Sequence, residues 1–358
     1  MNLQPRAARV QTRPRALALL LALAALAALA ALPARGATES PTAGYAARAD
    51  VKAFIAELAA NDGFDAAGLR QVFAQVRPQP SVVAAMSRPL VAPPTWFDYA
   101  PRFLNPARVD AGTTFWQGNA AALARAEIEF GVPAEVIVAI IGVETFYGRN
   151  TGSYRVIDAL TTLAFDYPRR AQFFTGELRN FLLLMRDQGV SPLLPRGSFA
   201  GAIGLPQFMP GSIRDYAVDY DGDGRIDLAT EPVDAIGSVA NYLARHGWQP
   251  GQPVMEAARI EGDDRDATLR TLDGGMSERR ALAQWVNGGV TGFAIPGSLA
   301  ADPVGLLMLE ERANPTYWVV FNNWYVLTRY NRSRLYASAV WQLALALKDA
   351  LVQAMPAR

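Results

Sequence analysis

The sequence has no cysteine and only one histidine, and these two absences exclude several kinds of site. Without cysteine there is no disulfide, no thiol nucleophile and no cysteine-ligated metal. A single histidine excludes metal sites built from several imidazoles, and a Ser-His-Asp triad would have to use His246. Because His246 follows "NYLAR" in a helical pattern, we interpret it as a structural residue.

An excess of charge of either sign is also missing. The 358 residues include 34 Lys and Arg and 33 Asp and Glu, for a formal net charge of +1. The basic residues are spread along the chain, whereas a protein that reads phosphates normally gathers them on one face. We therefore expect no nucleic-acid partner. The length is sufficient for a sizeable core and two or three subdomains.

The N-terminal residues have the three-part pattern of an export signal. Residues 1–15 are basic and contain no acid, residues 16–32 are a run of 17 Ala and Leu, and "PARGATES" follows with small residues. We predict a signal peptide over residues 1–37, with an uncleaved membrane anchor as the alternative. No cysteine follows the run, so attachment as a bacterial lipoprotein is excluded. Residues 38–50 are small and polar and are typical of a linker.

Helical spacing of apolar residues dominates the rest of the chain and predicts a mainly α (α+β) fold. We expect helices at 51–64, 65–76, 113–131, after Pro133, 156–167, 169–189, 234–247 and 333–351. β-Branched and aromatic residues predict strands in 252–262, 303–311 and 316–330. Residues 77–96 contain five prolines, and we expect them to be irregular.

The segment "DYDGDGRID" predicts a cation site. Three carboxylates at alternating positions, a glycine at the sixth and a backbone carbonyl at the seventh match the opening of an EF-hand loop. These residues are Asp219, Asp221, Asp223, Gly224 and Arg225, with Asp227 also in the loop. Oxygen ligands favour Ca²⁺, and we expect a structural role for it. The twelfth position is Thr230, so we predict that Asp234 closes a longer loop; the alternative is a polar Asp-Gly turn.

One carboxylate interrupts the apolar segment "EVIVAIIGVETFYGRN". On a helix, Glu144 shares a face with isoleucines three, four and seven residues before it. Burial raises the pKa of a carboxyl group, and a general acid must stay protonated near neutral pH. The alternative is a buried ion pair, for which Arg149, Arg169 and Arg170 are the candidates. No second carboxylate lies at a spacing that would suggest a two-carboxylate glycosidase.

Four long segments together resemble the lytic murein transglycosylase B family over roughly residues 50 to 350. They are "IIGVETFYGRNTGSYRVIDALTTLAFDYPRRAQFF", "GSFAGAIGLPQFMPGS", "DAIGSVANYLARHGW" and "TRYNRSRLYASAVWQL". The resemblance implies non-hydrolytic cleavage of the MurNAc–GlcNAc bond of peptidoglycan, which leaves 1,6-anhydromuramoyl ends. It also implies a lysozyme-like core with an α-helical domain, a small β subdomain and a calcium loop. The expected location is the periplasm.

The resemblance assigns domains to this chain as well. We expect an α-helical domain at 51–110, to which 333–355 returns. A catalytic core at 111–250 would contain the calcium loop at 219–234, and a β-rich subdomain would span 251–328. The expected partners are glycan strands and possible cell-wall synthesis or division proteins. We expect Ca²⁺, no organic cofactor and a monomer.

The resemblance also assigns roles to individual residues. Glu144 matches the family's single catalytic acid and base. Six positions match substrate-binding residues: Ser198, Gln207, Tyr242, Tyr330, Arg169 and Arg170. The calcium loop of the family matches Asp219, Asp221, Asp223, the Arg225 carbonyl and Asp234. Ser198 and Gln207 could instead belong to a tight turn, and the two tyrosines to the core.

Three other functions compete with this interpretation. A muramidase would cleave the same bond with water, and a silent wall-binding protein would not cleave it. A calcium-regulated interaction protein would bind partners only with calcium. The chain departs from the family in lacking the lipid-attachment cysteine, in a calcium loop one residue longer, and at Phe146 and Gly211.

Overall fold

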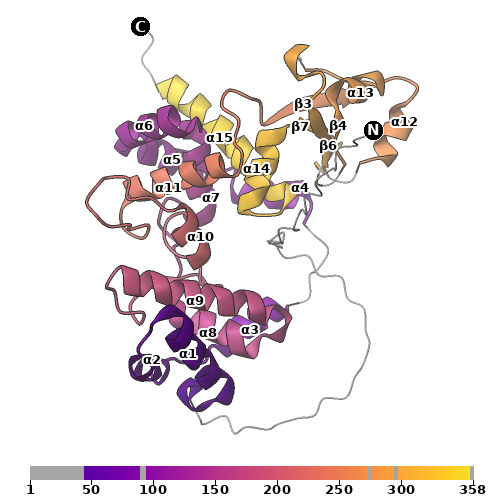
Figure 1. The fold of residues 1–358 in the computed structure, drawn as a ribbon. Coiled ribbons are helices and arrows are strands. Elements are labelled where there is room, and N and C mark those ends of the chain that lie inside the picture. Colours follow the sequence, from indigo (N-terminus) through magenta and orange to yellow (C-terminus); the bar gives the residue numbers. More distant parts are fainter. Residues whose placement is uncertain (1–43, 89–93, 273–275, 277, 294–296, 355–358) are drawn as a thin grey trace, which may run out of the picture.

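The computed structural model describes residues 44–88, 94–272, 276, 278–293 and 297–354 (Figure 1). The predicted signal and residues 38–43 of the predicted linker lie outside the described residues. Residues 44–50 of that linker belong to the fold: Tyr45–Ala47 form a 3-10 turn, Ala49 begins a helix, and Tyr45 is 2% exposed. The described chain is mainly helical with a five-stranded sheet and a two-stranded ribbon, which confirms the predicted mainly α (α+β) class.

The helices form two groups, and the sheet lies beside one of them (Figure 1). The first group packs α8 against α9 and α3, with α1 and α2 alongside. Its members are α1 (Ala49–Asp62), α2 (Ala66–Phe73), α3 (Pro80–Ser87), α8 (Val156–Asp166) and α9 (Ala171–Asp187). The second group is centred on α7. Its members are α5 (Pro106–Gly118), α6 (Ala120–Phe130), α7 (Ala134–Thr145), α11 (Pro232–Arg245), α14 (Asn322–Tyr330) and α15 (Arg334–Ala354). The helix α10 (Pro210–Tyr216) connects the two groups, because it packs against both α9 and α11.

The sheet has five antiparallel strands in the order β4-β6-β7-β3-β5. The strands are β3 (Met255–Ile260), β4 (Arg280–Ala281), β5 (Val290–Thr291), β6 (Pro303–Leu309) and β7 (Thr316–Val320). The short helices α12 (Arg265–Arg270) and α13 (Leu282–Asn287) accompany it. One sheet face adds to the main core, while Trp285 anchors a second, smaller core on the other face. A two-stranded ribbon, β1 (Tyr154–Arg155) and β2 (Arg196–Gly197), lies within the helical part.

The predicted helix at 113–131 is wrong as a single helix, because the structure breaks it at Asn119. This residue has φ −123° and ψ 21°, and its side-chain amide donates to the Phe115 carbonyl at 2.8 Å. Asparagine side chains compete in this way with backbone hydrogen bonds, so the break has a local cause.

Two further expectations differ from the structure. The proline-rich segment 77–96 contains α3, because Pro80 occupies the first helical turn, where its missing N–H costs no hydrogen bond. Val82 and Met86 then bury one face of that helix. The predicted strand at 316–330 is a strand only to Val320 and continues as α14, which buries Trp324 and Leu327. Aromatic composition alone does not distinguish these two outcomes.

The last helix is the longest apolar element. Residues Arg334–Gln353 of α15 have the length and composition to cross a bilayer, but half of this stretch is buried within the fold. The helix packs against α5, α7 and α14, as a core helix does. The division into domains, including the return of 333–355 to an N-terminal domain, remains a prediction.

Two short helical elements precede α5 in the sequence. The helix α4 (Trp96–Tyr99) continues directly into the 3-10 turn η2 (Ala100–Arg102). The others are the 3-10 turns η1 (Tyr45–Ala47), η3 (Pro168–Arg170) and η4 (Gly297–Leu299). Tyr99, which directly precedes η2, lies near the end of α7.

Candidate active site

Glu144 lies in the last turn of α7, the most deeply buried helix of the fold. Ile137, Ile140 and Ile141 on its face have no exposed surface. Glu144 itself is half-buried, because α7 ends one residue later. The helical periodicity therefore places the carboxyl group on the buried face of α7, at the edge of the core, as the sequence predicts.

A tyrosine from the far end of the chain binds this carboxyl group. The hydroxyl of Tyr336, on α15, donates to Oε1 of Glu144 at 2.7 Å. Burial raises the pKa of Glu144 to about 7, and the hydrogen bond from Tyr336 opposes part of that rise by stabilising the carboxylate. Near neutral pH the group can therefore donate a proton and, once ionised, accept one.

Phenols, not guanidinium groups, surround the carboxyl. Tyr99, Tyr330 and Tyr336 all have a raised pKa, first because they are buried and then because of the Glu144 charge. Among the described residues Glu144 has no ion pair, so the alternative of a buried pair with Arg149, Arg169 or Arg170 finds no support.

Tyr330 and Tyr242 form one aromatic cluster with Tyr336. Tyr330 stacks on Tyr336, with ring centres 6.3 Å apart, and meets Tyr242 edge-on at 5.0 Å. Tyr242 is only 4% exposed and donates to the Arg329 carbonyl at 2.8 Å. His246 stacks on Tyr242 at 4.0 Å, and its Nδ1 lies 2.7 Å from the Tyr242 carbonyl. Both contacts agree with a structural role for His246.

The loop that carries Ser198 and Gln207 is fastened to this cluster and to α7. Tyr330 donates to the Pro206 carbonyl at 2.6 Å, and Thr145 donates to the Leu205 carbonyl at 2.9 Å. Because Thr145 directly follows Glu144, the second bond sets the loop against the carboxyl-bearing turn.

Within the loop, Gln207 has φ 50°, and its amide donates to the carbonyls of Thr151 and Gly204. Ser198 accepts from the backbone N–H groups of Ala200 and Ala202. Ser198 and Gln207 are both half-buried. These bonds hold the loop in one conformation beside Glu144.

The arginine pair lies elsewhere, at the turn between α8 and α9. Arg169 is exposed. The Arg170 guanidinium lies over the Phe173 ring at 4.3 Å, and burial lowers its pKa. Within the described residues, neither arginine forms a hydrogen bond or an ion pair with Glu144 or Tyr336.

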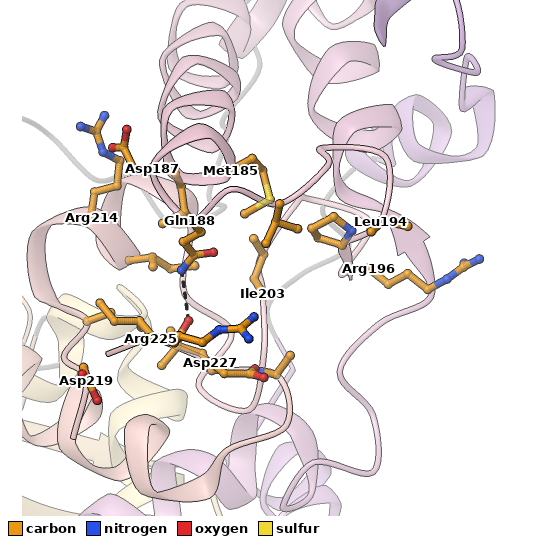
Figure 2. Close-up of a pocket in the computed structure, with 18 of the residues that line it drawn as sticks. Met185, Asp187, Gln188, Leu194, Arg196, Ile203, Arg214, Asp219, Arg225 and Asp227 are labelled. Atoms are coloured by element: carbon orange, nitrogen blue, oxygen red, sulfur yellow. Dashed lines mark hydrogen bonds between the residues drawn. The ribbon is translucent and has the colours of Figure 1, made fainter. Parts of the chain in front are cut away.

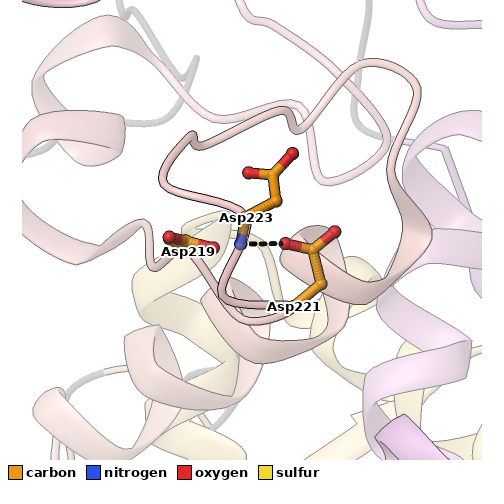
Figure 3. A group of neighbouring side chains, drawn as sticks. All are labelled: Asp219, Asp221 and Asp223. Atoms are coloured by element: carbon orange, nitrogen blue, oxygen red, sulfur yellow. Dashed lines mark hydrogen bonds between the residues drawn. The ribbon is translucent and has the colours of Figure 1, made fainter.

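Three of the predicted metal ligands come together in the loop before α11. Figure 3 shows Asp219, Asp221 and Asp223 with their carboxylates gathered, and one oxygen of each lies within 4.8 Å of the others. All three are exposed. Three hard carboxylate donors in a small space fit Ca²⁺.

The other three predicted calcium ligands, Asp234, Asp227 and Arg225, form hydrogen bonds within the loop. Asp234 is 1% exposed and accepts from the backbone N–H groups of Tyr220 at 2.7 Å and Asp227 at 2.8 Å. The Asp227 carboxylate caps the turn at Thr230, while the Arg225 N–H donates to Asp223. The Asp234 carboxylate thus organises the loop from its buried end.

A cavity of about 850 Å³ lies beside this loop, between α9, α10 and the segment 190–203 (Figure 2). Gln188 bridges it by donating to the Ile226 carbonyl at 3.1 Å. Glu144 is not among the residues that line this cavity, so the cavity is separate from the Glu144 carboxyl group.

Sequence reasoning missed Tyr336 and Tyr99. Tyr336 falls within a segment that carried the resemblance, but helical periodicity marks it only as a buried position. Tyr99 lies next to a proline-rich stretch with no regular pattern. Only the folded chain brings them to Glu144.

Known proteins are similar to this chain in sequence and in fold. Residues 46–345 match the transglycosylase SLT domain family. The chain is 41% identical over 318 residues to the membrane-bound lytic murein transglycosylase B of Escherichia coli, covering 86% of this chain and 85% of that protein.

Solved structures agree. Soluble lytic transglycosylase SltB1 from Pseudomonas aeruginosa matches with 46% identity and a TM-score of 0.80, over 85% of this chain and 99% of that one. The Escherichia coli lytic transglycosylase Slt35 in complex with calcium matches with 42% identity and a TM-score of 0.79, over 86% and 96%. The resemblance is confirmed: this chain belongs to the transglycosylase SLT domain family and is a lytic transglycosylase of peptidoglycan.

Proposed function

We propose that Glu144 is the only acid and base of this lytic transglycosylase. As a carboxylic acid it protonates the glycosidic oxygen while the bond from that oxygen to C1 of the muramoyl residue breaks. As a carboxylate it then takes the proton from the C6 hydroxyl as that oxygen bonds to C1. The proton returns to Glu144, no water is consumed, and the product ends in a 1,6-anhydromuramoyl group. The observation that carries this proposal is a single carboxyl group, half-buried at the end of α7 and hydrogen-bonded by Tyr336, whose pKa burial raises to about 7.

A second carboxylate is not required by this scheme. The groups that face Glu144 in the structure are phenols. We infer that the N-acetyl group of the muramoyl residue assists at C1, as in substrate-assisted glycosidases. The hydrogen bond from Tyr336 then stabilises the carboxylate formed after the first proton transfer.

The loop of Ser198 and Gln207 would form one wall of the glycan cleft. The bonds from Thr145 and Tyr330 to this loop support the assignment, because they fix it beside Glu144. Tyr330 belongs to the same wall. Tyr242 supports it from behind, since its own ring is buried. Arg169 and Arg170 would bind carboxylates of the stem peptide farther along the glycan strand.

The calcium loop would hold one structural Ca²⁺ through Asp219, Asp221 and Asp223, with the Arg225 carbonyl as a further ligand. The gathered carboxylates and the calcium complex of Slt35 support this. Asp227 and Asp234 would orient the loop through their hydrogen bonds to backbone N–H groups. Asp234 would close the loop at its C-terminal end. An export signal in residues 1–37 would deliver the enzyme to the periplasm, where its glycan substrate lies.

Product analysis on purified sacculi tests the proposal. Mass spectrometry should find products one water lighter than the reducing sugars that a muramidase releases. Glu144→Gln should abolish cleavage while glycan binding persists. A silent wall-binding protein would show no cleavage in the wild type either. Reducing ends from the wild type, or cleavage by Glu144→Gln, would refute the mechanism. Calcium-dependent capture of protein partners would instead favour an interaction protein.

A further inference from the structure

The turn directly after Glu144 has an unusual backbone. Phe146 and Tyr147 both lie in the left-handed region, with φ 53° and 57°, and Gly148 follows with φ 87°. Residues with a Cβ rarely adopt this conformation, and two in succession persist only where the surroundings hold them. Because Phe146 is two residues from Glu144, the turn determines where α7 ends and where the carboxyl group points.

One arginine from another helix holds this turn. Arg108, near the start of α5, places its guanidinium over the Phe146 ring at 4.7 Å. Its Nη1 donates to the Gly142 carbonyl, in the last turn of α7, as a second hydrogen bond to that oxygen. The Phe146 N–H donates to the same carbonyl at 3.0 Å. Arg108 thus completes the C-terminal cap that the left-handed turn begins.

The same guanidinium also contacts the segment that precedes α5. It lies over the Phe103 ring at 5.2 Å, and Nη2 donates to the Arg102 carbonyl at 3.3 Å. Arg102 ends η2, the turn that directly follows Tyr99. A single side chain therefore joins the segment that carries Tyr99 to the turn that carries Glu144.

Arg108 does not act on the carboxyl group directly. The titratable groups that face Glu144 are Tyr99 from α4, Tyr330 from α14 and Tyr336 from α15. Arg108 is half-buried on the other side of the turn, where burial lowers its own pKa. Any effect on Glu144 must pass through the backbone of the turn.

We propose that Arg108 is a positioning residue for the transglycosylase reaction, which holds the Phe146–Tyr147 turn and so keeps the Glu144 carboxyl among its three phenols. This inference rests on Glu144 being the acid and base. Without Arg108 the turn relaxes, water reaches the carboxyl group, and its pKa falls towards the ordinary range. The first proton transfer then fails at a lower pH.

Arg149 offers a matched control. Its guanidinium lies over the same Phe146 ring at 4.6 Å, but Arg149 is exposed, and among the described residues its side chain donates no hydrogen bond to α7. Initial rates on purified peptidoglycan should be measured from pH 5 to 9 for Arg108→Met, Arg108→Lys and Arg149→Met. The fold of each variant is checked by its circular dichroism spectrum and melting temperature.

Arg108→Met should lower kcat about tenfold or more with little change in KM, and move the alkaline limb of the kcat profile to lower pH by about one unit. Arg108→Lys should show a smaller shift, because one ammonium group can still bind the Gly142 carbonyl. Arg149→Met should keep the wild-type profile. If Arg108→Met does not fold, the shift in Arg108→Lys decides the question.

A double variant distinguishes an effect on the turn from a general loss of packing around Arg108. Glycine adopts left-handed φ readily, so Arg108→Met combined with Phe146→Gly should recover part of the lost alkaline activity. An unshifted limb in both Arg108 variants, or an equal shift in Arg149→Met, would overturn the inference. Cleavage by Glu144→Gln would instead overturn the proposed function, so the two failures can be told apart.

Discussion

Replacing Glu144 by glutamine should stabilise the protein above neutral pH and have little such effect in acid. The folded chain raises the pKa of this carboxyl from an ordinary 4.5 to about 7. As the pH rises between these values, the unfolded chain releases a proton that the folded chain retains. Unfolding is therefore favoured progressively from pH 4.5, and the loss of stability is complete above pH 7.

The size of the effect follows from the two pKa values. One unit corresponds to about 1.4 kcal/mol, so the carboxyl destabilises the fold by about 3 kcal/mol at pH 8. Glutamine has nearly the same shape and no charge, and its oxygen can still accept from Tyr336. We expect the melting temperature of Glu144→Gln to exceed that of the wild type by roughly 5 °C at pH 8.

Calorimetry or denaturant unfolding at several pH values between 4 and 8 measures this difference. Glu57→Gln, at an exposed position of α1, is the matched control for the substitution itself. The gain should appear only above pH 4.5 and level off past pH 7. A Glu144→Gln variant that is equally or less stable than the wild type across the whole range would refute the reasoning.

Three further predictions concern the surroundings of the site. Tyr336→Phe removes a hydrogen bond that stabilises the Glu144 carboxylate, so the alkaline limb of activity should move up by about one pH unit; a downward move would contradict this. A chelator should lower the melting temperature of the wild type but not of Asp221→Asn, and equal responses would count against a calcium site. Gly152→Ala should destabilise the fold by roughly 2 kcal/mol or more, since its Cβ would lie 2.1 Å from the Gly197 backbone; wild-type unfolding would disprove the close contact.

Local pattern was sufficient to predict the helix of Glu144 and its buried face. Apolar residues three, four and seven positions before Glu144 lie on one side of any helix, so the prediction needed no partner. The acidic loop was predictable for a similar reason, because the three carboxylates are close in sequence. Both features depend on contacts within about fifteen residues.

The partners of Glu144 could not be predicted in this way. Tyr336 lies 192 residues away, and only the packing of α15 on α7 brings it to the carboxyl group. Its burial looks the same in sequence as that of any core tyrosine. The break at Asn119 and the switch from β7 to α14 were missed for a different reason: side-chain hydrogen bonding and tertiary packing overrode the local preference.

The central claim is that one carboxyl group, half protonated near neutral pH, performs both proton transfers. Its most direct test is a carbon-13 NMR titration of protein labelled at glutamate carboxyls, with Glu144→Gln identifying the resonance by its absence. We predict an apparent pKa for Glu144 near 7. A titration midpoint near 4.5 would contradict it, because the group would then be ionised before it could protonate the glycosidic oxygen.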